Sequence, residues 1–223
     1  MAVEKDICSP SVFESRLSFG LDRLSIPFTA SMLQQFYLYY RELVKWNRKI
    51  NLTAISDFKG VITGHFLDSA AYVRALPDSN DLRMLDIGSG AGFPGIPLKI
   101  LIPSLVLEVA DSRNKKLEFM KHLGRILRLE GVEYCWYRFQ KENAGRRYDV
   151  VVSRACLPPI DFFELAGSLL LPGGRAVLSE GPAASRRFMN GPFPGNLKFR
   201  SVSVEIPDSN LVRTLLTAEK KKL

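Results

Sequence analysis

The sequence has few of the residues that build disulfide frameworks or structural metal sites. Its 223 residues include three cysteines and two histidines. The cysteines, Cys8, Cys135 and Cys156, are odd in number and show no C-x-x-C spacing. We therefore predict that all three remain unbridged thiols and that the protein holds no structural zinc ion.

Long apolar runs are missing as well. No stretch approaches the roughly 20 consecutive apolar residues that a membrane-spanning helix needs. The segment from Met1 to Asp6 has no apolar region of the secretory type. Together these absences predict a cytoplasmic protein. The length suits one substantial core plus an appended element, and neither repeats nor low-complexity tracts interrupt it.

Positive charge is in excess. The formal net charge is +8 at pH 7, which favours a polyanionic partner such as RNA or DNA. Each basic side chain taken singly is more simply a solvated charge. The candidates for phosphate contact are Arg48, Lys49, Arg113, Lys115, Lys116, Arg186 and Arg187.

One glycine-rich segment, residues 84–95, organises the rest of the chain. An apolar run ends in Asp86, and four glycines follow at close spacing before an apolar pattern resumes. This order predicts a strand, a tight turn and a helix, with bare backbone that lets a ligand approach closely. The N-terminus of the helix would face an anionic or polar part of that ligand.

Two classes of cofactor use such a turn. Residues 90–95 match the G-x-G-x-x-G pattern of dinucleotide-binding proteins, but a single match of this kind does not decide between the classes. Methyltransferases that use S-adenosylmethionine (AdoMet) typically place an acid where Asp86 stands, to orient the methionine end. A second acid, Asp111, ends the next apolar run and is placed to hold the ribose hydroxyls. The two acids favour AdoMet over a dinucleotide and over a turn without a ligand.

Strand and helix patterns alternate in the second part of the chain, which predicts a mostly parallel sheet with helices on both faces. Only residues 207–210 separate the last two strands, so these must form an antiparallel hairpin. Such a sheet is the mark of class I AdoMet-dependent methyltransferases, an α/β fold. We predict strands near 82–87, 105–110, 133–137, 148–152, 174–179, 198–206 and 211–218, and helices near 95–102, 114–130, 160–170 and 183–190.

An N-terminal helical extension precedes this fold. We predict residues 1–78 as the extension and residues 79–223 as the AdoMet-binding domain. The expected helices of the extension cover 7–24, 28–47 and 58–76, the second capped by Thr29 or Ser31. Its aromatic side chains are expected to pack in the core rather than stack on bases.

Polar residues between the second and third helices predict a fixed turn. Asn47, Asn51 and Thr53 are of the types that bond to nearby backbone. In the third helix His65 and Asp68 are three residues apart and thus share a face. We expect a hydrogen bond on the helix surface there, with a general acid–base pair as the alternative.

Six segments of the sequence resemble motifs of the GidB/RsmG family, bacterial enzymes that methylate N7 of a guanine in 16S ribosomal RNA. The resemblance runs from about residue 30 to the end. The segments are residues 46–47, 50–55, 65–69, 86–97, 111–112 and 153–155.

The resemblance implies roles for individual residues. Gly88 and Phe93 would contact AdoMet, Asp111 would hold its ribose, and Arg154 would lie beside the cofactor and the incoming RNA. Of the triplet 138–140, the last two residues would approach the adenine. The predicted cofactor-binding residues are Asp86, Gly88, Gly90, Gly92, Phe93, Asp111, Phe139, Gln140 and Arg154, and Arg154 is the predicted catalytic residue.

Three positions depart from the family pattern. Gly64 stands where an arginine is common, Gln140 replaces an acid, and Glu180 replaces a lysine. Arg154 has a structural alternative, an ion pair with a carboxylate such as Asp111 or Asp149. The expected partner is ribosomal RNA or the assembled small subunit, with a monomeric enzyme and no metal ion.

The chemistry of guanine N7 is consistent with the residues present. N7 carries an in-plane lone pair, so no proton has to leave before attack and no general base is needed. Rival base methylations lack their features. Residues 157–160 have no side-chain amide and no aromatic ring for an adenine amine, and Cys156 is expected to be a packed small residue rather than a nucleophile. The alternatives are methylation of another RNA or a small molecule, a nucleotide-binding oxidoreductase, and a non-enzymatic RNA-binding protein.

Overall fold

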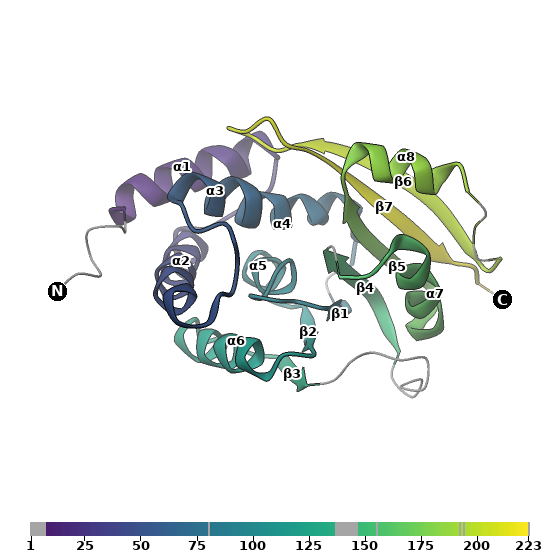
Figure 1. The fold of residues 1–223 in the computed structure, drawn as a ribbon, viewed down its shortest axis with the longest axis horizontal. Coiled ribbons are helices and arrows are strands. Elements are labelled where there is room, and N and C mark those ends of the chain that lie inside the picture. The colour runs from purple at the N-terminus through teal and green to yellow at the C-terminus, as the bar shows by residue number, and fades with distance from the viewer. Residues whose placement is uncertain are drawn as a thin grey trace.

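A seven-stranded sheet forms the centre of the protein in a computed structural model that describes residues 8–79, 81–136, 147–154, 156–191, 193 and 195–222 (Figure 1). The order of the strands across the sheet is β3-β2-β1-β4-β5-β7-β6. Their bounds are β1 (Arg83–Ile87), β2 (Val106–Asp111), β3 (Val132–Trp136), β4 (Tyr148–Arg154), β5 (Leu170–Glu180), β6 (Leu197–Glu205) and β7 (Val212–Lys220).

The strand directions confirm the predicted fold class. Strands β1 to β5 run parallel to one another, whereas β7 is antiparallel to both β5 and β6. β7 therefore lies between β5 and β6, and β6 is its hairpin partner. Because parallel strands bring their carboxyl ends to one edge, that edge collects the residues that follow β1, β2 and β4.

Eight α-helices surround this sheet in the described part of the chain. A single π-helical turn (Ile62–Leu67) and a 3₁₀ turn (Ala71–Ala75) complete the segment around α4. The helices are α1 (Pro10–Arg23), α2 (Ala30–Ile50), α3 (Phe58–Val61), α4 (Asp68–Ala70), α5 (Gly95–Leu101), α6 (Asn114–Ile126), α7 (Pro159–Leu169) and α8 (Pro182–Met189).

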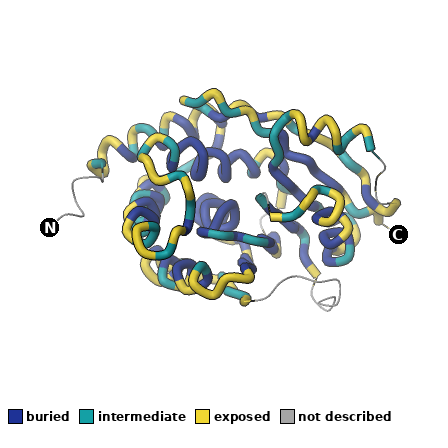
Figure 2. Tube along the Cα trace, viewed as in Figure 1, coloured by how far each residue is buried: buried dark blue, intermediate teal, exposed yellow. Residues whose placement is uncertain are grey.

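The strands alternate between two hydrophobic cores, one on each face of the sheet. In β4, Val150 and Val152 belong to one core and Val151 to the other, because successive side chains of a strand point to opposite faces. The first core joins the sheet to α1, α2, α5 and α6, and the second joins it to α7. Figure 2 shows this buried interior in dark blue. The N-terminal helices therefore share a core with the sheet rather than forming their own.

Aromatic side chains of α2 are core residues, as predicted. Phe36, Tyr39 and Tyr40 are almost completely buried, and the ring of Tyr39 stacks on that of Phe93 with 5.2 Å between centroids. Thr29 is the N-cap of α2, where its hydroxyl accepts a hydrogen bond from the backbone N–H of Met32. The stacking of Tyr39 on Phe93 packs α2 against the glycine-rich segment.

Three predicted elements differ in detail. The helix predicted over 58–76 is a succession of α, π and 3₁₀ turns. The helix predicted over 114–130 ends at Ile126, because Arg128 has a left-handed backbone (φ 52°) that the helix cannot continue. β5 begins at Leu170, four residues before the predicted strand, because Leu170 already pairs with Tyr148 of β4 ahead of an irregularity in register.

The structure bears on two of the sequence predictions, those on disulfides and on membrane-spanning helices. Cys8, Cys135 and Cys156 form no disulfide. Within the described residues, no helix combines the length and the apolar character that crossing a membrane requires.

Candidate active site

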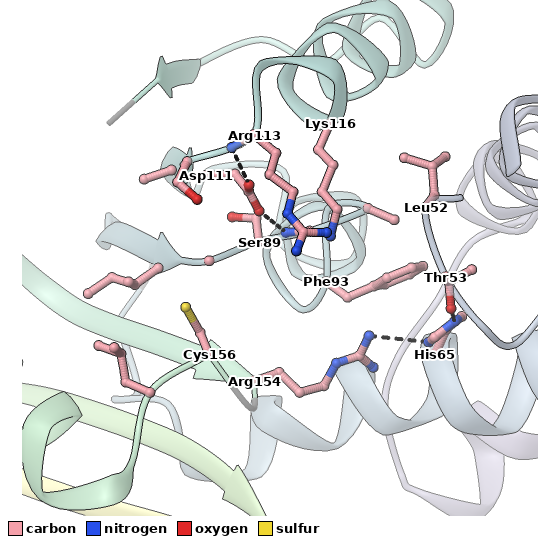
Figure 3. Close-up of a pocket in the computed structure, with 17 residues that line it drawn as sticks. Leu52, Thr53, His65, Ser89, Phe93, Asp111, Arg113, Lys116, Arg154 and Cys156 are labelled. Atoms are coloured by element: carbon pink, nitrogen blue, oxygen red, sulfur yellow. Dashed lines mark hydrogen bonds between the residues drawn. The ribbon is translucent and has the colours of Figure 1, made fainter. Parts of the chain in front are cut away.

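A cavity of about 600 Å³ opens at the carboxyl edge of the sheet (Figure 3). Its volume falls within the range of small-molecule sites. The walls come from four places: the glycine-rich loop after β1, the end of β2, the end of β4, and the turn and helix around Thr53 and His65. Segments from both the N-terminal part and the sheet therefore meet at one cavity.

The glycine-rich loop forms the floor between β1 and α5. Gly88 and Gly90 line the cavity and have φ values of 71° and 62°, a region that favours glycine. The backbone N–H of Gly88 donates to the carbonyl of Ala110 at the end of β2, 2.8 Å away. Gly92 does not line the cavity. A Cβ there would come within 2.8 Å of the Tyr39 hydroxyl oxygen, so its role is close packing against α2.

Asp111 ties the end of β2 to that loop. Its Oδ2 accepts a hydrogen bond from the N–H of Gly90 at 2.9 Å, and its Oδ1 accepts one from the N–H of Arg113 at 2.8 Å. Each carboxylate oxygen has a second lone pair. The carboxylate at the cavity wall can therefore still accept two hydroxyl donors, which is what a ribose offers.

Asp86 lies behind the wall rather than on it. Its side chain is fully buried, and its Oδ2 accepts a hydrogen bond from the N–H of Gly95, the first residue of α5, at 2.9 Å. Among the described residues, its Oδ1 has no hydrogen-bond partner. Burial raises the pKa of Asp86 to about 7. Asp86 thus anchors α5 to β1, and it occupies the helix N-terminus that the sequence assigned to a ligand.

Arg154, at the end of β4, is held by three partners around the π-helical turn. Its Nη1 donates to the carbonyl of Gly64 at 3.1 Å and to Oδ2 of Asp68 at 3.3 Å, and its Nη2 donates to Nδ1 of His65 at 3.2 Å. The guanidinium carbon also lies 5.0 Å from the centre of the Phe93 ring. Of its five N–H groups, the Nε–H and one Nη2–H have no partner among the described residues. Those two donors remain for a ligand in the cavity.

The structural alternative for Arg154 was an ion pair with a carboxylate such as Asp111 or Asp149, and the ion pair forms with Asp68. Asp68 is 1% exposed and also accepts a hydrogen bond at Oδ1 from Nε of Arg213 in β7, 2.9 Å away. The expected hydrogen bond on the helix surface between His65 and Asp68 is wrong, because both side chains are buried and Arg154 lies between them. π-Helical turns frequently occur at functional sites, and this one brings Gly64, His65 and Asp68 around a single guanidinium.

His65 is a neutral imidazole with a fixed tautomer. A guanidinium only donates, so Nδ1 of His65 accepts from Arg154 and the proton lies on Nε2. Nε2 then donates to the hydroxyl oxygen of Thr53 at 2.8 Å. Burial, together with the neighbouring charge of Arg154, lowers the pKa of His65 to about 3. The ring also stacks on Phe93, with 4.4 Å between centroids.

Comparison with known proteins identifies similar methyltransferases. A family model described as GidB, rRNA small subunit methyltransferase G, matches residues 32–190. The ribosomal RNA small subunit methyltransferase G of Bacillus cereus (strain AH187) is 36% identical over 211 residues, 91% of this chain and 88% of that protein. The protein of the same name from Bacillus mycoides (strain KBAB4) is 35% identical over the same shares.

The chain belongs to the GidB family. Membership confirms the predicted resemblance and, with it, the predicted enzyme class: an rRNA methyltransferase that uses AdoMet. The cavity suits this cofactor, because Gly88 and Gly90 offer bare backbone to a ligand and Asp111 retains acceptor capacity for ribose hydroxyls.

More distant solved structures share the fold. A methyltransferase from Pyrococcus furiosus superimposes with a TM-score of 0.56 at 15% identity, over 84% of this chain and 98% of that one. The T. thermophilus 16S rRNA N2 G1207 methyltransferase (RsmC), solved in complex with AdoMet and guanosine, gives 0.53 at 17% identity, over 70% of this chain and 42% of that one. At these identities the likeness shows the fold alone, and it confirms the class I methyltransferase architecture.

The predicted site residues fall into three groups. Gly88, Gly90, Phe93, Asp111 and Arg154 line the cavity of this GidB family member. Asp86 and Gly92 support the wall from behind. Phe139 and Gln140 lie outside the described residues.

Sequence reasoning did not include several cavity-lining residues among the predicted cofactor-binding residues. Thr53 and His65 come from the N-terminal part and line the cavity. Both lie in segments that resemble family motifs, but the sequence did not show that these segments reach the cavity. Arg113 and Lys116 were predicted as phosphate contacts, and both face the cavity. Cys156 was expected to be a packed residue, which is wrong: it is exposed and lines the cavity beside Gly88, although burial of its thiol raises its pKa.

Replacing Gly88 with alanine is expected to destabilise the protein more than the matched change Gly90→Ala. Both residues have positive φ, which costs an alanine about 1 kcal/mol or more. A new Cβ at Gly90 would make only ordinary van der Waals contacts, whereas at Gly88 it would clash with the Cys156 Sγ. We expect an additional loss of about 1–3 kcal/mol in the free energy of unfolding, measured with urea in the absence of AdoMet. Pairing Gly88→Ala with Cys156→Gly should recover that excess, and equal losses for the two single variants would contradict the clash.

Acid should weaken the fold through His65. The folded pKa of about 3 lies below the 6.5 of the unfolded chain, so between these values the unfolded state binds more protons. The stabilising contribution is therefore complete above pH 6.5 and is lost as the pH falls toward 3. Asp86 acts in the opposite sense, since its raised pKa stabilises the fold below pH 3.8 and the contribution disappears as the pH rises through 7. The pH dependence of the wild-type free energy of unfolding therefore contains the contributions of both His65 and Asp86.

A His65→Asn variant isolates the histidine. Its free energy of unfolding should fall less steeply with acid than that of the wild type, by up to about 1.4 kcal/mol per pH unit between pH 6 and 4. Urea denaturation at half-unit steps of pH measures both curves. Parallel curves would show that His65 titrates normally in the folded protein.

Proposed function

We propose that this enzyme transfers the methyl group of AdoMet to N7 of a guanine in 16S ribosomal RNA. The observation that carries the choice of N7 is the state of the one histidine at the cavity. Both nitrogens of His65 are engaged and its pKa is about 3, so it takes up no proton at neutral pH. Methylation of an amine or a hydroxyl releases a proton to a base, whereas N7 offers a lone pair directly. A site built to align rather than to deprotonate suits N7.

AdoMet, when bound, supplies a methyl group on a positively charged sulfur, and that carbon–sulfur bond breaks as N7 attacks. The backbone of Gly88 and Gly90 would lie against the cofactor, and Asp111 would accept hydrogen bonds from its ribose. Phe139 and Gln140 would approach the adenine, as the resemblance implies. Asp86 and Gly92 would act through the shape of the loop.

Arg154 would act on the substrate side. Its Nε–H and remaining Nη2–H are aimed at no other described residue, and Phe93, His65 and Asp68 fix the guanidinium plane. Donors held in a fixed plane suit O6 of a guanine and leave the N7 lone pair free for the methyl group. No proton moves through Arg154, so its contribution is orientation of N7 toward the methyl group.

The basic side chains at the cavity would receive the RNA backbone. Arg113 and Lys116 line the cavity on the side of Asp111 (Figure 3), and they lie where phosphates flanking an entering guanine could be neutralised. We further propose the division into an extension (1–78) and an AdoMet-binding domain (79–223), which together line the cavity and share one hydrophobic core. The enzyme would act as a monomer in the cytoplasm, on ribosomal RNA or on the assembled small subunit.

Transfer of labelled methyl from AdoMet to small ribosomal subunits that lack base methylation tests this function. Subunits and protein-free 16S RNA are used in parallel, and the digested RNA is separated into nucleosides. Label in 7-methylguanosine is the expected result, and the better substrate of the two identifies the physiological form. If no label enters RNA while AdoMet binding is verified by calorimetry, the ribosomal function is excluded and a small-molecule substrate becomes the better explanation.

A further inference from the structure

Thr53 is clamped beside the cavity by its own turn. The side-chain amide of Asn47 accepts from the backbone N–H of Thr53 and donates to its carbonyl, both at 2.9 Å. The predicted fixed turn is therefore confirmed for these two residues. The clamp places the Thr53 side chain at the cavity wall opposite Asp111 and next to His65 (Figure 3). Its position does not depend on a ligand.

The hydroxyl of Thr53 already accepts two hydrogen bonds. The backbone N–H of Ile55 donates to Oγ1 at 3.1 Å. Nε2–H of His65 donates to the same oxygen at 2.8 Å, a direction fixed because Nδ1 accepts from Arg154. A hydroxyl oxygen has two lone pairs and one hydrogen. Both lone pairs are used, so toward any ligand Thr53 can only donate.

Within the ranges that the structure describes, these two are the only hydrogen bonds of Oγ1, and the hydroxyl hydrogen is donated to no residue there. Arg154 is restricted in the same way, since a guanidinium has no acceptor at all. The side chains of Thr53 and Arg154 therefore present hydrogen-bond donors and no free acceptor to the cavity.

We propose that Thr53 is a specificity-determining residue whose hydroxyl donates to O6 of the target guanine, an inference that rests on the proposed function. The Hoogsteen edge of guanine presents two acceptors, N7 and O6. N7 must keep its lone pair for the methyl group, which leaves O6 for the donors of the protein. Adenine presents an amine in place of O6, and that amine would face donors with no acceptor to receive it. The Thr53 side of the cavity therefore selects guanine over adenine.

The first measurement separates substrate from cofactor. Thr53→Val removes the hydroxyl at nearly constant shape, and we expect kcat/KM for 16S RNA to fall by about 10-fold or more while the AdoMet Kd changes less than twofold. Thr53→Ser keeps the donor and should restore most of kcat/KM. Thr63→Val serves as the matched control, because the Thr63 hydroxyl is buried and donates to the carbonyl of Lys59 away from the cavity. Its activity should stay unchanged.

The second measurement identifies the atom on the RNA. Once the methylated guanine has been mapped, RNA with 2-aminopurine at that position retains N7 and has hydrogen in place of O6. The wild-type enzyme should lose about 10-fold in kcat/KM on this RNA, and Thr53→Val should lose nothing further. Thr53→Val also leaves the donors of His65 and Ile55 without an acceptor, but that defect is the same with both RNAs and cancels in the ratio.

Each outcome decides one statement. Losses that multiply, as for independent sites, would overturn the contact between Thr53 and O6. A rise in the AdoMet Kd as large as the fall in kcat/KM would overturn it too and assign the hydroxyl to the cofactor. Absence of 7-methylguanosine with the unaltered enzyme would overturn the proposed function itself.

Discussion

Methyl transfer by an Arg154→Ala variant is expected to fall by about 100-fold or more, the size of loss that misaligned reacting atoms produce. The substitution removes the two donors that no other described residue engages and the charge that lies over Phe93. It also leaves Nδ1 of His65 without a donor, and it leaves Asp68 with Arg213 as its remaining ion-pair partner. Single-turnover transfer to RNA at saturating AdoMet measures the loss of alignment directly.

The same variant should also lose stability, by about 1–3 kcal/mol, because Asp68 and His65 are buried and each loses a charged hydrogen-bond donor. Arg154→Lys separates the two effects. Its ammonium can reach Asp68 and hold the fold, yet it lacks the planar fork that faces both His65 and the substrate. We expect near-normal stability with most of the activity loss. Full activity in Arg154→Lys would show that charge alone, without the fork, suffices.

Asp111→Asn should weaken AdoMet binding by about 10- to 100-fold, which corresponds to about 1.4–2.7 kcal/mol. The carboxylate now accepts from two backbone N–H groups, those of Gly90 and Arg113. An amide has one acceptor oxygen, so its NH₂ must face one of these donors, and the loop that carries Gly90 loses its tie to β2. The uncharged amide is also a weaker acceptor for ribose hydroxyls. Calorimetric titration with AdoMet in the absence of RNA measures the change.

Asp149→Asn is the matched control for this variant. Asp149 also accepts from a backbone N–H, that of Arg83 at 2.9 Å, but outside the cavity. Its single bond survives in an amide whose oxygen takes the place of Oδ2. AdoMet affinity should stay within twofold of the wild type. Equal losses in the two variants would show that the effect of Asp111→Asn is general weakening of the sheet rather than loss of a cofactor contact.

Much of this architecture could be predicted from local patterns. The strands, the glycine-rich turn and the acid at the end of β2 lie within short stretches whose spacing is sufficient to place them. The contact between Gly90 and Asp111 follows because β1 and β2 are neighbouring parallel strands, so their ends meet. Gly88 and Arg154 reach the cavity for the same reason.

What could not be predicted depends on pairings between distant segments. Arg154 and Asp68 are 86 residues apart, and Asp68 and Arg213 are 145 apart. Choosing Asp68 over Asp111 or Asp149 requires knowing that the π-helical turn lies against the ends of β4 and β7. The position of Asp86 was missed because an acid before a glycine-rich turn can face the ligand or the helix, and only packing decides. In this chain the N–H of Gly95 donates a hydrogen bond to the carboxylate of Asp86.

The ion pair between Asp68 and Arg213 has a consequence for biosynthesis. Arg213 belongs to β7, which follows every other strand in sequence yet inserts between β5 and β6. While the chain is still emerging from a ribosome, the segments up to β5 can collapse around the glycine-rich loop, but β5 has an open edge and Asp68 has one of its two arginine partners. The guanidinium of Arg154 gains its complete support only after β7 leaves the exit tunnel. A nascent chain would therefore form the cavity before both arginine partners of Asp68 are in place.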